Sequence, residues 1–202
     1  MRVTMAGKVA VRREVLRKSL IDIATQRIAR DGLSALRARD LAGDAGCAVG
    51  AIYNVFGDLN DLVLTVNADT FQALGQDVAT SLSQADQTPV QQLIVMSQAY
   101  HRFAAQNYFL WRALFDLERP KGEAAPDWYL AEMGQLFTFI HDPLSAAFPQ
   151  MDADQRALLT KALFSSVHGI VLLGLDDASA GVQPANIDDM IALILNQIIG
   201  PK

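Results

Sequence analysis

The amino-acid sequence predicts an all-α protein of about nine helices, and three observations lead to that prediction. Apolar residues recur at steps of three and four through most of the chain, which is the pattern of an amphipathic helix. No stretch of about six residues alternates convincingly between apolar and polar side chains, so we expect no β-sheet. Several periodic segments also begin or end at a residue that suits a helix terminus, such as Pro89 or Gly32.

Four helices are expected in the first part of the chain. The first covers residues 9–31, and Gly32 follows it, because the end of a helix favours a residue that adopts positive φ. Two short helices are expected at about 38–45 and 49–55, and a long one at about 59–83. The apolar stripes that predict the two longer helices are Leu16, Leu20, Ile23, Ala24 and Ile28, and Leu59, Leu62, Val63, Val66 and Phe71.

Five further helices are expected in the rest of the chain. Thr88-Pro89 opens the first of them, since proline suits the first turn, and its stripe runs to Ala104. An aromatic-rich helix follows from Asn107 to Leu117. The Pro- and Gly-containing stretches 118–122 and 176–184 are expected to be loops. The last three helices are expected at about 127–147, 153–176 and 184–199, with Asp152 as the N-cap of the middle one.

Composition excludes several classes of protein. With 51% hydrophobic and 19% charged residues, the chain is too apolar to be disordered. Its most apolar run, between Lys161 and Asp176, holds 14 residues, fewer than the ~20 of a membrane-spanning helix. A single cysteine, Cys47, excludes an internal disulfide and a cysteine cluster for zinc. Since we also recognise no secretion signal, we expect a cytoplasmic protein outside the membrane, with no metal or cofactor.

Charge is divided unevenly along the chain. Residues 1–57 carry ten Lys and Arg against five Asp and Glu, a balance of +5. Residues 58–202 carry seven basic and 17 acidic side chains, a balance of −10. A basic head on an acidic body favours a polyanionic partner such as nucleic acid. A basic N-terminal segment that is merely solvated remains the alternative.

Residues 38–56 fit a helix-turn-helix. Two short helices joined by a turn of three to four residues that contains glycine, here Gly46, form this motif. The second helix of such a motif lies in the major groove of DNA. The first helix would pack through Leu41, Ala42 and Ala45, and the second would bury Val49, Ile52 and Phe56. The other face of the second helix would show Ala48, Gly50, Ala51, Tyr53 and Asn54.

The order of residues in this segment resembles the DNA-binding head of the tetracycline-repressor family. Arg39-Asp40-Leu41-Ala42, Ala45-Gly46-Cys47 and the run from Gly50 to Phe56 match that family's Ile/Leu-Ala, Ala-Gly and Leu/Ile-Tyr-x-x-Phe pattern. The match covers about 50 residues by motif, and the rest by helix count. It implies a DNA-binding head over residues 1–57, linked by a fourth helix from about 59 to an effector-binding and dimerisation domain over 58–202.

The candidate DNA contacts follow from the chemistry of the side chains. Small residues at 48, 50 and 51 let the second helix approach the groove closely, and the Tyr53 hydroxyl can donate to a phosphate. Asn54 can pair with an adenine edge, which gives about 1–3 kcal/mol of discrimination. Arg37 and Arg39 can reach a phosphate or a guanine. Two alternatives stay open, because Tyr53 could pack in the core, and Arg12, Arg13, Arg17 and Lys18 could form a DNA-following arm or a solvated face.

The sequence also departs from the family pattern after Phe56. The family usually has a Ser-Lys or Asn-Lys pair there, and its lysine grips a phosphate. This chain has Gly57-Asp58-Leu59-Asn60-Asp61, so leucine stands between acids where the lysine is expected. We therefore expect DNA binding that is weaker or depends more on Arg37 and Arg39. Asp58 and Asp61 are expected to stabilise the N-terminus of the fourth helix.

For the body, the resemblance implies a small-molecule pocket and pairing with a second copy. Helices 153–176 and 184–199 are apolar nearly all round, which favours a two-fold four-helix bundle over the core of a monomer. Phe164 to Gly169 resembles the Trp-x-x-x-His-Gly signature of one subfamily, with Phe in place of Trp. The candidate ligand-binding residues are Phe103, Trp111, Phe115, Phe137, His141 and His168, although such histidines and aromatics are also common in a core.

These observations predict a homodimeric repressor that a small molecule releases from a palindromic double-stranded operator. One alternative keeps the fold but not the DNA function, as a sensor or interaction protein whose head no longer binds an operator. A second alternative is a helical enzyme that uses His101, His141 or His168 beside Asp176-Asp177 or Glu132. No nucleophile–base or metal motif supports the enzyme, and it would leave the basic head unexplained.

Overall fold

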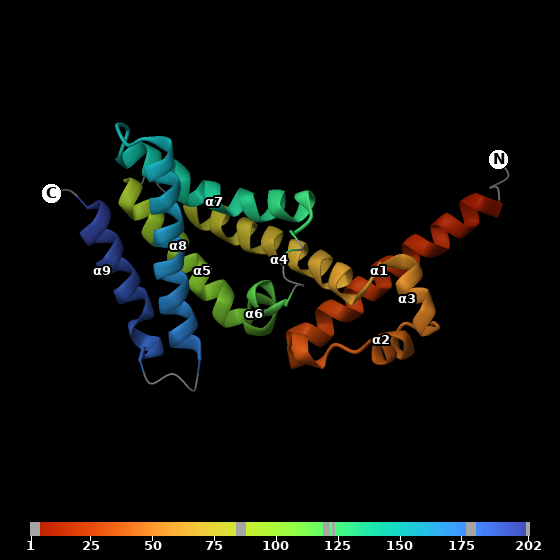
Figure 1. Cartoon of the computed structure of the whole chain (residues 1–202). Coiled ribbons are helices and arrows are strands. Elements are labelled where there is room, and N and C mark those ends of the chain that lie inside the picture. Colours follow the sequence, from red (N-terminus) through yellow and green to blue (C-terminus); the bar gives the residue numbers. More distant parts are fainter. Residues whose placement is uncertain (1–4, 84–87, 119–121, 123, 177–180, 201–202) are drawn as a thin grey trace. The chain divides into compact units, whose positions relative to one another are not determined.

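The computed structural model describes residues 5–83, 88–118, 122, 124–176 and 181–200, and these residues form nine α-helices and no strand (Figure 1). The all-α prediction is confirmed. The helices are α1 (Met5–Asp31), α2 (Ala38–Asp44), α3 (Val49–Val55), α4 (Leu59–Leu82), α5 (Pro89–Gln106), α6 (Tyr108–Asp116), α7 (Asp127–Ala147), α8 (Ala153–Leu175) and α9 (Ile187–Ile199), with 3-10 helices η1 (Leu33–Ala35) and η2 (Pro184–Asn186).

Most helix ends agree with the prediction within a residue or two, and two differ. α1 begins at Met5, ahead of the expected residue 9, so it is longer at its N-terminus. α9 begins at Ile187, because Pro184 starts a short 3-10 turn before it. The two expected loops lie partly outside the described residues, which exclude 119–121, 123 and 177–180.

The chain divides into two compact units that are discontinuous in sequence. Unit 1 consists of residues 1–70 and 107–125, and unit 2 of residues 71–106 and 126–202. Helix α4 therefore passes from one unit into the other, and α6 belongs to the same unit as α1, α2 and α3. The expected division at residue 57 followed the order of the sequence, whereas the compact units follow packing.

Unit 1 has one apolar core, built from α1, α2, α3, the start of α4, and α6. Along α1, Leu20, Ala24 and Ile28 are fully buried, as their helical spacing predicts. Gly32 ends α1 with φ of +80°, the conformation that favours glycine at this position. The buried residues of this core are Leu20, Ala24, Ile28, Leu36, Leu41, Ala42, Ile52, Phe56, Leu62, Val63, Val66 and Ala113.

Unit 2 packs α5 against α7, α8 and α9. Asp152 caps α8, since its Oδ1 accepts a hydrogen bond of 2.9 Å from the Gln155 N–H, which confirms the predicted N-cap. Near the other end of α8, Gly174 permits close packing on α9, because a Cβ there would lie 2.5 Å from Cδ1 of Ile187. A larger residue at this position would therefore force the Ile187 side chain to shift.

The outer side of α8 is not covered within one chain. Leu163, Val167 and Val171 are buried, whereas Leu158 and Leu173 are 70% and 47% exposed. Within one chain, α8 is therefore covered on the side that faces the other helices of unit 2, and the dimer expected from its apolar surface stays a prediction. By length and composition α8 could also cross a membrane, but one such helix is weak evidence, since a core helix passes the same test.

The packing of α3 yields a matched pair of substitutions. Ile52→Ala is expected to lower the free energy of unfolding by about 2–5 kcal/mol, because it leaves a cavity at a fully buried site. Val49→Ala, on the same helix at a site 38% exposed, is expected to change it by about 0.5 kcal/mol or less. Urea unfolding followed by circular dichroism measures both, and equal losses would mean that α3 packs through another face.

Candidate functional site

The helix-turn-helix predicted at residues 38–56 is formed by α2 and α3. α2 closes with a hydrogen bond of 2.9 Å from the Ala45 N–H to the Leu41 carbonyl. Gly46 then takes φ of +62°, which an L side chain rarely adopts, and the chain reverses direction. The Cys47 N–H returns to the Ala42 carbonyl at 2.9 Å, and extended backbone at Ala48 leads into α3. The turn is therefore specified by local sequence.

Packing decides which face of α3 is exposed. Ile52 is fully buried, while Tyr53 is 46% exposed, so the alternative in which Tyr53 packs in the core is wrong. Val49 was expected to be buried but is exposed, because residues three apart on a helix point about 60° away from each other. The exposed face consists of Val49, Gly50, Tyr53 and Asn54.

The other predicted DNA-contact residues lie at the starts of the two helices. Arg37 and Arg39 are exposed where α2 begins, directly after the buried Leu36. Within the described part of the chain, neither guanidinium makes an ion pair or hydrogen bond, so both cations face solvent. Ala48 is exposed and Ala51 half-buried. All seven predicted residues thus belong to α2, α3 or the residues just before them.

An ion pair fixes the helix-turn-helix to α1. Both Nε and Nη2 of Arg27 reach Oδ2 of Asp44, at 2.7 and 2.6 Å. Arg27 lies on α1 and Asp44 ends α2, so the pair ties the end of α2 to the long helix. Sequence reasoning missed it, because no spacing rule relates charges 17 residues apart.

A second pair reduces the number of unpaired cations in unit 1. Arg30 donates from Nε and Nη2 to Oδ2 of its neighbour Asp31, at 2.9 and 2.7 Å. This hydrogen bond, with the attraction of opposite charges, holds the pKa of the Asp31 carboxyl below its ordinary value and raises the pKa of Arg30. Asp31 therefore stays ionised to lower pH than a free aspartate, and its charge offsets that of Arg30.

The start of α4 has acidic residues in structural roles. Oδ1 of Asp58 accepts a hydrogen bond of 2.8 Å from the Asp61 N–H, so Asp58 stabilises the helix N-terminus as predicted. The Asp61 carboxylate folds back toward Gly57, where a Cβ would lie 2.6 Å from its Oδ2. Leu59 is half-buried against the core of unit 1. No cation therefore lies at residues 57–61.

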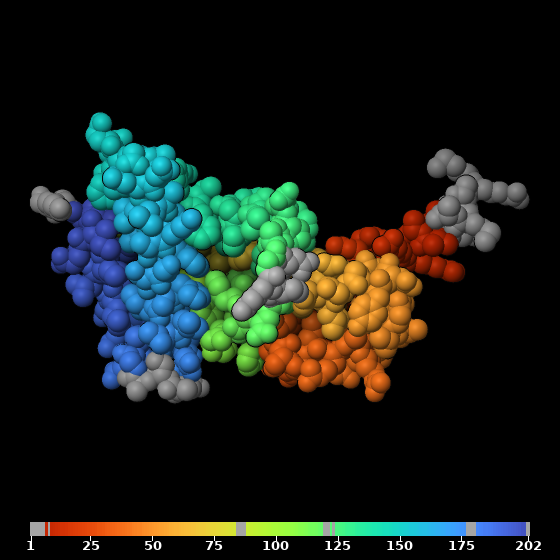
Figure 2. All heavy atoms as spheres, in the orientation of Figure 1, coloured from red at the N-terminus to blue at the C-terminus, as the bar shows by residue number. Residues whose placement is uncertain are grey.

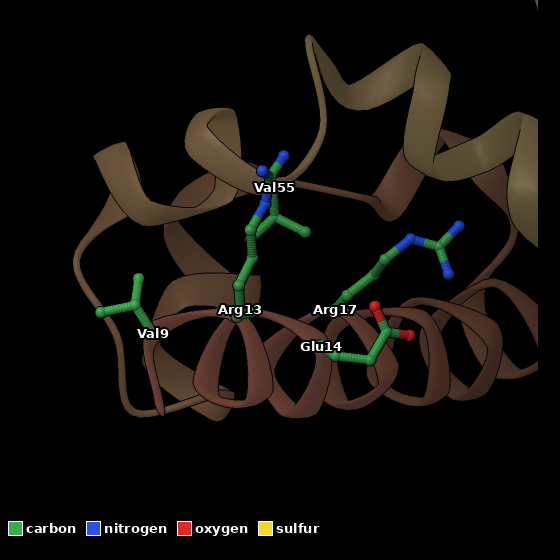
Figure 3. Close-up of a pocket in the computed structure, with 6 residues that line it drawn as sticks. Val9, Arg13, Glu14, Arg17 and Val55 are labelled. Carbon is green, nitrogen blue, oxygen red and sulfur yellow. The ribbon is translucent and has the colours of Figure 1, made fainter. Parts of the chain in front are cut away.

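An open cleft of about 710 Å³ lies between the N-terminal half of α1 and the end of α3. Figure 3 shows Arg13 extending from α1 toward Val55, whereas the guanidinium of Arg17 points away from Val55. The Arg17 guanidinium lies 5.4 Å from the centre of the Phe56 ring, a cation–π contact. Because α1 is helical from Met5, residues 12–18 lie within a helix and not in an extended arm. The cleft is lined by Val9, Ala10, Arg13, Glu14, Arg17 and Val55.

In unit 2, an aromatic cluster joins α5, α7 and α8. The Tyr100 hydroxyl and Nδ1 of His168 share a hydrogen bond of 2.7 Å. The Phe164 ring stacks on His168 with centroids 5.6 Å apart, and Phe137 meets Phe164 edge-on at 5.2 Å. The structure thus brings together the predicted residues Phe137 and His168. Sequence reasoning missed Tyr100, since nothing in its helix distinguishes it from a core tyrosine.

The remaining predicted ligand residues belong to different helices and to both units. Phe103 is buried in α5, and His141 is exposed beside its neighbour Asp142. Trp111 and Phe115 lie on α6 and belong to unit 1. The six residues are therefore not one group within either unit.

The acid–base partners expected for the enzyme alternative differ from those observed. Nδ1 of His101 lies 2.8 Å from Oδ1 of Asp188, and this contact joins α5 to α9, whereas the partners expected from the sequence were Glu132 and Asp176-Asp177. Asp177 lies outside the described residues. Within the described ranges, no three His, Cys, Asp or Glu side chains lie close enough together to hold a metal ion.

Comparison with known proteins agrees with this architecture. Residues 93–198, just over half of the chain, match the sequence family described as tetracyclin repressor-like, C-terminal domain. No curated protein sequence matches the chain.

Three similar solved structures illustrate the fold. RolR in complex with resorcinol is 18% identical, with a TM-score of 0.68 over 96% of this chain and 91% of that chain. FadR from Bacillus subtilis in complex with stearoyl-CoA is 14% identical, with a TM-score of 0.67 over 92% and 99%. The TetR-family regulator PfmR from Thermus thermophilus is 18% identical, with a TM-score of 0.59 over 89% and 96%. At these identities the likeness concerns the fold.

Proposed function

We propose a function for this chain from its family, because it belongs to the tetracycline-repressor-like family of transcriptional regulators. In this proposal the chain is a homodimeric repressor, and a small molecule releases it from a palindromic operator. The observation that carries the proposal is the exposed face of α3, with Tyr53 and Asn54 on it and the solvent-facing Arg37 and Arg39 at the start of α2. Regulators of this kind act by binding, so we propose that the protein catalyses no reaction. We also propose that it acts on DNA in the cytoplasm.

In this proposal α3 enters the major groove of DNA. The small residues Ala48, Gly50 and Ala51 let its backbone approach the base edges, and Asn54 pairs with an adenine. The Tyr53 hydroxyl donates to a phosphate and fixes the register of the head. Arg37 and Arg39 contact a phosphate or a guanine.

A second copy of the chain would cover the exposed apolar side chains of α8 and α9. Leu158 and Leu173 on α8, and Leu193 and Ile198 on α9, are all more than a third exposed in one chain. Burial of such side chains stabilises an isologous contact, and two heads about 34–36 Å apart would then read half-sites one turn apart. The proposed interface consists of residues 153–176 and 184–199.

We propose that the effector site lies in unit 2, with Phe137 and His168 as the candidate contacts that the structure joins through Phe164. Support comes from the cluster in which Phe164 stacks on His168 and Tyr100 bonds to it, because aromatic walls with a polar group suit a small organic molecule. Two proteins of similar fold bind resorcinol and stearoyl-CoA. An effector would release DNA if it bound more tightly to a state of the dimer in which the spacing of the two heads does not fit the operator. The coupling free energy between effector and DNA binding is expected to be about 1–3 kcal/mol.

The second candidate function is a sensor or interaction protein that does not bind an operator. Asp58 and Asp61 favour it, since their carboxylates repel phosphate and flank Leu59, which stands where the family usually has a lysine. The two functions differ in a single measurable property, the salt-dependent affinity of the chain for DNA.

Arg39→Ala and Tyr53→Ala are expected to weaken DNA binding, because they remove a base or phosphate contact worth about 1–3 kcal/mol, roughly 5- to 150-fold in affinity. Fluorescence anisotropy of the full chain with DNA from upstream of its own gene, at about 50–300 mM salt, measures the loss. Arg102→Ala, at an exposed cation on α5 outside the proposed DNA and dimer surfaces, is the matched control. Equal, weak binding of all variants to that fragment and to random DNA would favour the sensor.

Leu193→Glu is expected to shift the protein from dimer to monomer at micromolar concentration. The substitution places a charge in the proposed apolar interface, where it would be desolvated. Leu130→Glu, at an exposed leucine on α7, is the control and should stay dimeric. Sedimentation velocity distinguishes the two species, and a wild-type monomer or equal behaviour of both variants would contradict this interface.

Any compound that binds the body is expected to lower DNA affinity by about 5- to 150-fold, and His168→Ala should weaken the binding of that compound. Resorcinol, stearoyl-CoA and further small aromatic and acyl compounds are the first probes, tested by thermal shift and then in the anisotropy assay. A coupling factor of one for every compound that binds would contradict effector-controlled release.

A further inference from the structure

The N-terminal half of α1 is strongly basic in a chain that is acidic overall. Residues 8–18 contain Lys8, Arg12, Arg13, Arg17 and Lys18 against the single acid Glu14, while the whole chain has a net charge of −5. A local excess of positive charge on a rigid helix favours a polyanion over a small anion, because it extends beyond any one contact. Figure 2 shows the N-terminal part of α1 protruding beyond the rest of unit 1, and Arg12, Arg13 and Lys18 are exposed.

The side chains of this segment divide into two groups by direction. Arg13 and Arg17 line the cleft that α1 forms with the end of α3, whereas Lys18 is exposed outside it. Their neighbour across the cleft is Val55, the residue that follows Asn54. A DNA backbone that runs along the exposed face of α3 would therefore pass the mouth of this cleft.

The two arginines of the cleft are not equivalent. The Arg17 guanidinium lies over the Phe56 ring, and Glu14 stands three residues before it, close enough on a helix to offset its charge. Arg13 is exposed, and it makes no ion pair or hydrogen bond within the described ranges. Arg13 is therefore the cation that can bind a phosphate, and Arg17 shapes the wall beside it.

The start of α4 lacks the phosphate contact that the family usually makes there. The resemblance described above implies a phosphate-gripping lysine there, but Leu59 is packed against the core and Asp58 caps the helix. Asp61 adds a second negative charge in the first turn. The head thus has no cation at residues 57–61, whereas Arg13 on α1 is an exposed cation that lines the cleft beside the end of α3.

We propose that a backbone phosphate of the bound DNA sits in the cleft between α1 and α3, contacted by Arg13, with Arg17 as a positioning residue. The contact replaces the one lost at the start of α4. This inference rests on the proposed DNA-binding function and adds a sequence-independent anchor to it, since phosphate contacts carry no sequence information.

Arg13→Ala tests the phosphate contact, and Lys18→Ala is the matched control on the same helix. Arg39→Ala shows whether the helix-turn-helix itself binds DNA. Full-length variants are titrated by anisotropy against the upstream fragment and a random duplex at about 50–300 mM salt. Loss of one phosphate contact lowers the salt slope by about 0.9, so the ratio of affinities at 50 and 200 mM falls about 3.5-fold. We expect this change for Arg13→Ala on both duplexes, and none for Lys18→Ala, with an unchanged melting temperature in each.

The outcomes separate this inference from the proposed function. If Arg39→Ala loses affinity while Arg13→Ala behaves like Lys18→Ala, the cleft contact is wrong and the DNA-binding function stands. A loss for Arg13→Ala on the upstream fragment alone would also overturn it, because that result indicates base contact. If wild type binds neither duplex, both fall. The cleft could instead bind a small amphiphilic anion such as octanoate. If octanoate binds to wild type but not to Arg13→Ala, and the salt slope of DNA binding is the same for both, the phosphate contact is overturned.

Discussion

The burial of Ile52 in the core of unit 1 is the constraint on which the candidate site depends. A helix as short as α3 gains most of its stability from packing, and its period of 3.6 residues means that burial of one face exposes the opposite one. Ile52 shares a core with Leu41 of α2 and with Leu20 and Ile28 of α1. That core directs Tyr53 and Asn54 to the surface without any specific interaction of their own.

Polar contacts then hold the elements of unit 1 in register. The Arg27–Asp44 pair fixes the end of α2 against α1, and Asp58 starts α4. The fully buried Asn67 on α4 donates a hydrogen bond of 2.9 Å to the Ala113 carbonyl on α6. Because a buried amide needs such partners, this bond ties α6 to the unit that carries the helix-turn-helix. A change in the position of α6 would thus act directly on the helix that leads out of the head.

The sequence specifies the parts of this structure that depend on near neighbours. Gly46, the spacing of Leu41 and Ile52, and Asp152 as a cap could all be predicted, because turns, helical faces and caps are set within a few residues. Val49 was misplaced, since residues three apart on a helix differ in direction by about 60°, and the spacing alone does not show which of them the core covers. The pairing of Tyr100 with His168, 68 residues apart, and the membership of α6 in unit 1 could not be predicted, because they depend on how the helices pack.

Amide hydrogen exchange of the full-length protein, with and without saturating DNA from upstream of its gene, tests the central claim most directly. The account predicts that slowed exchange on DNA binding is concentrated in peptides covering residues 37–39, 48–54 and the N-terminal half of α1, the surfaces assigned to DNA. Unchanged exchange there in the presence of bound DNA, or protection confined to α7, α8 and α9, would contradict it.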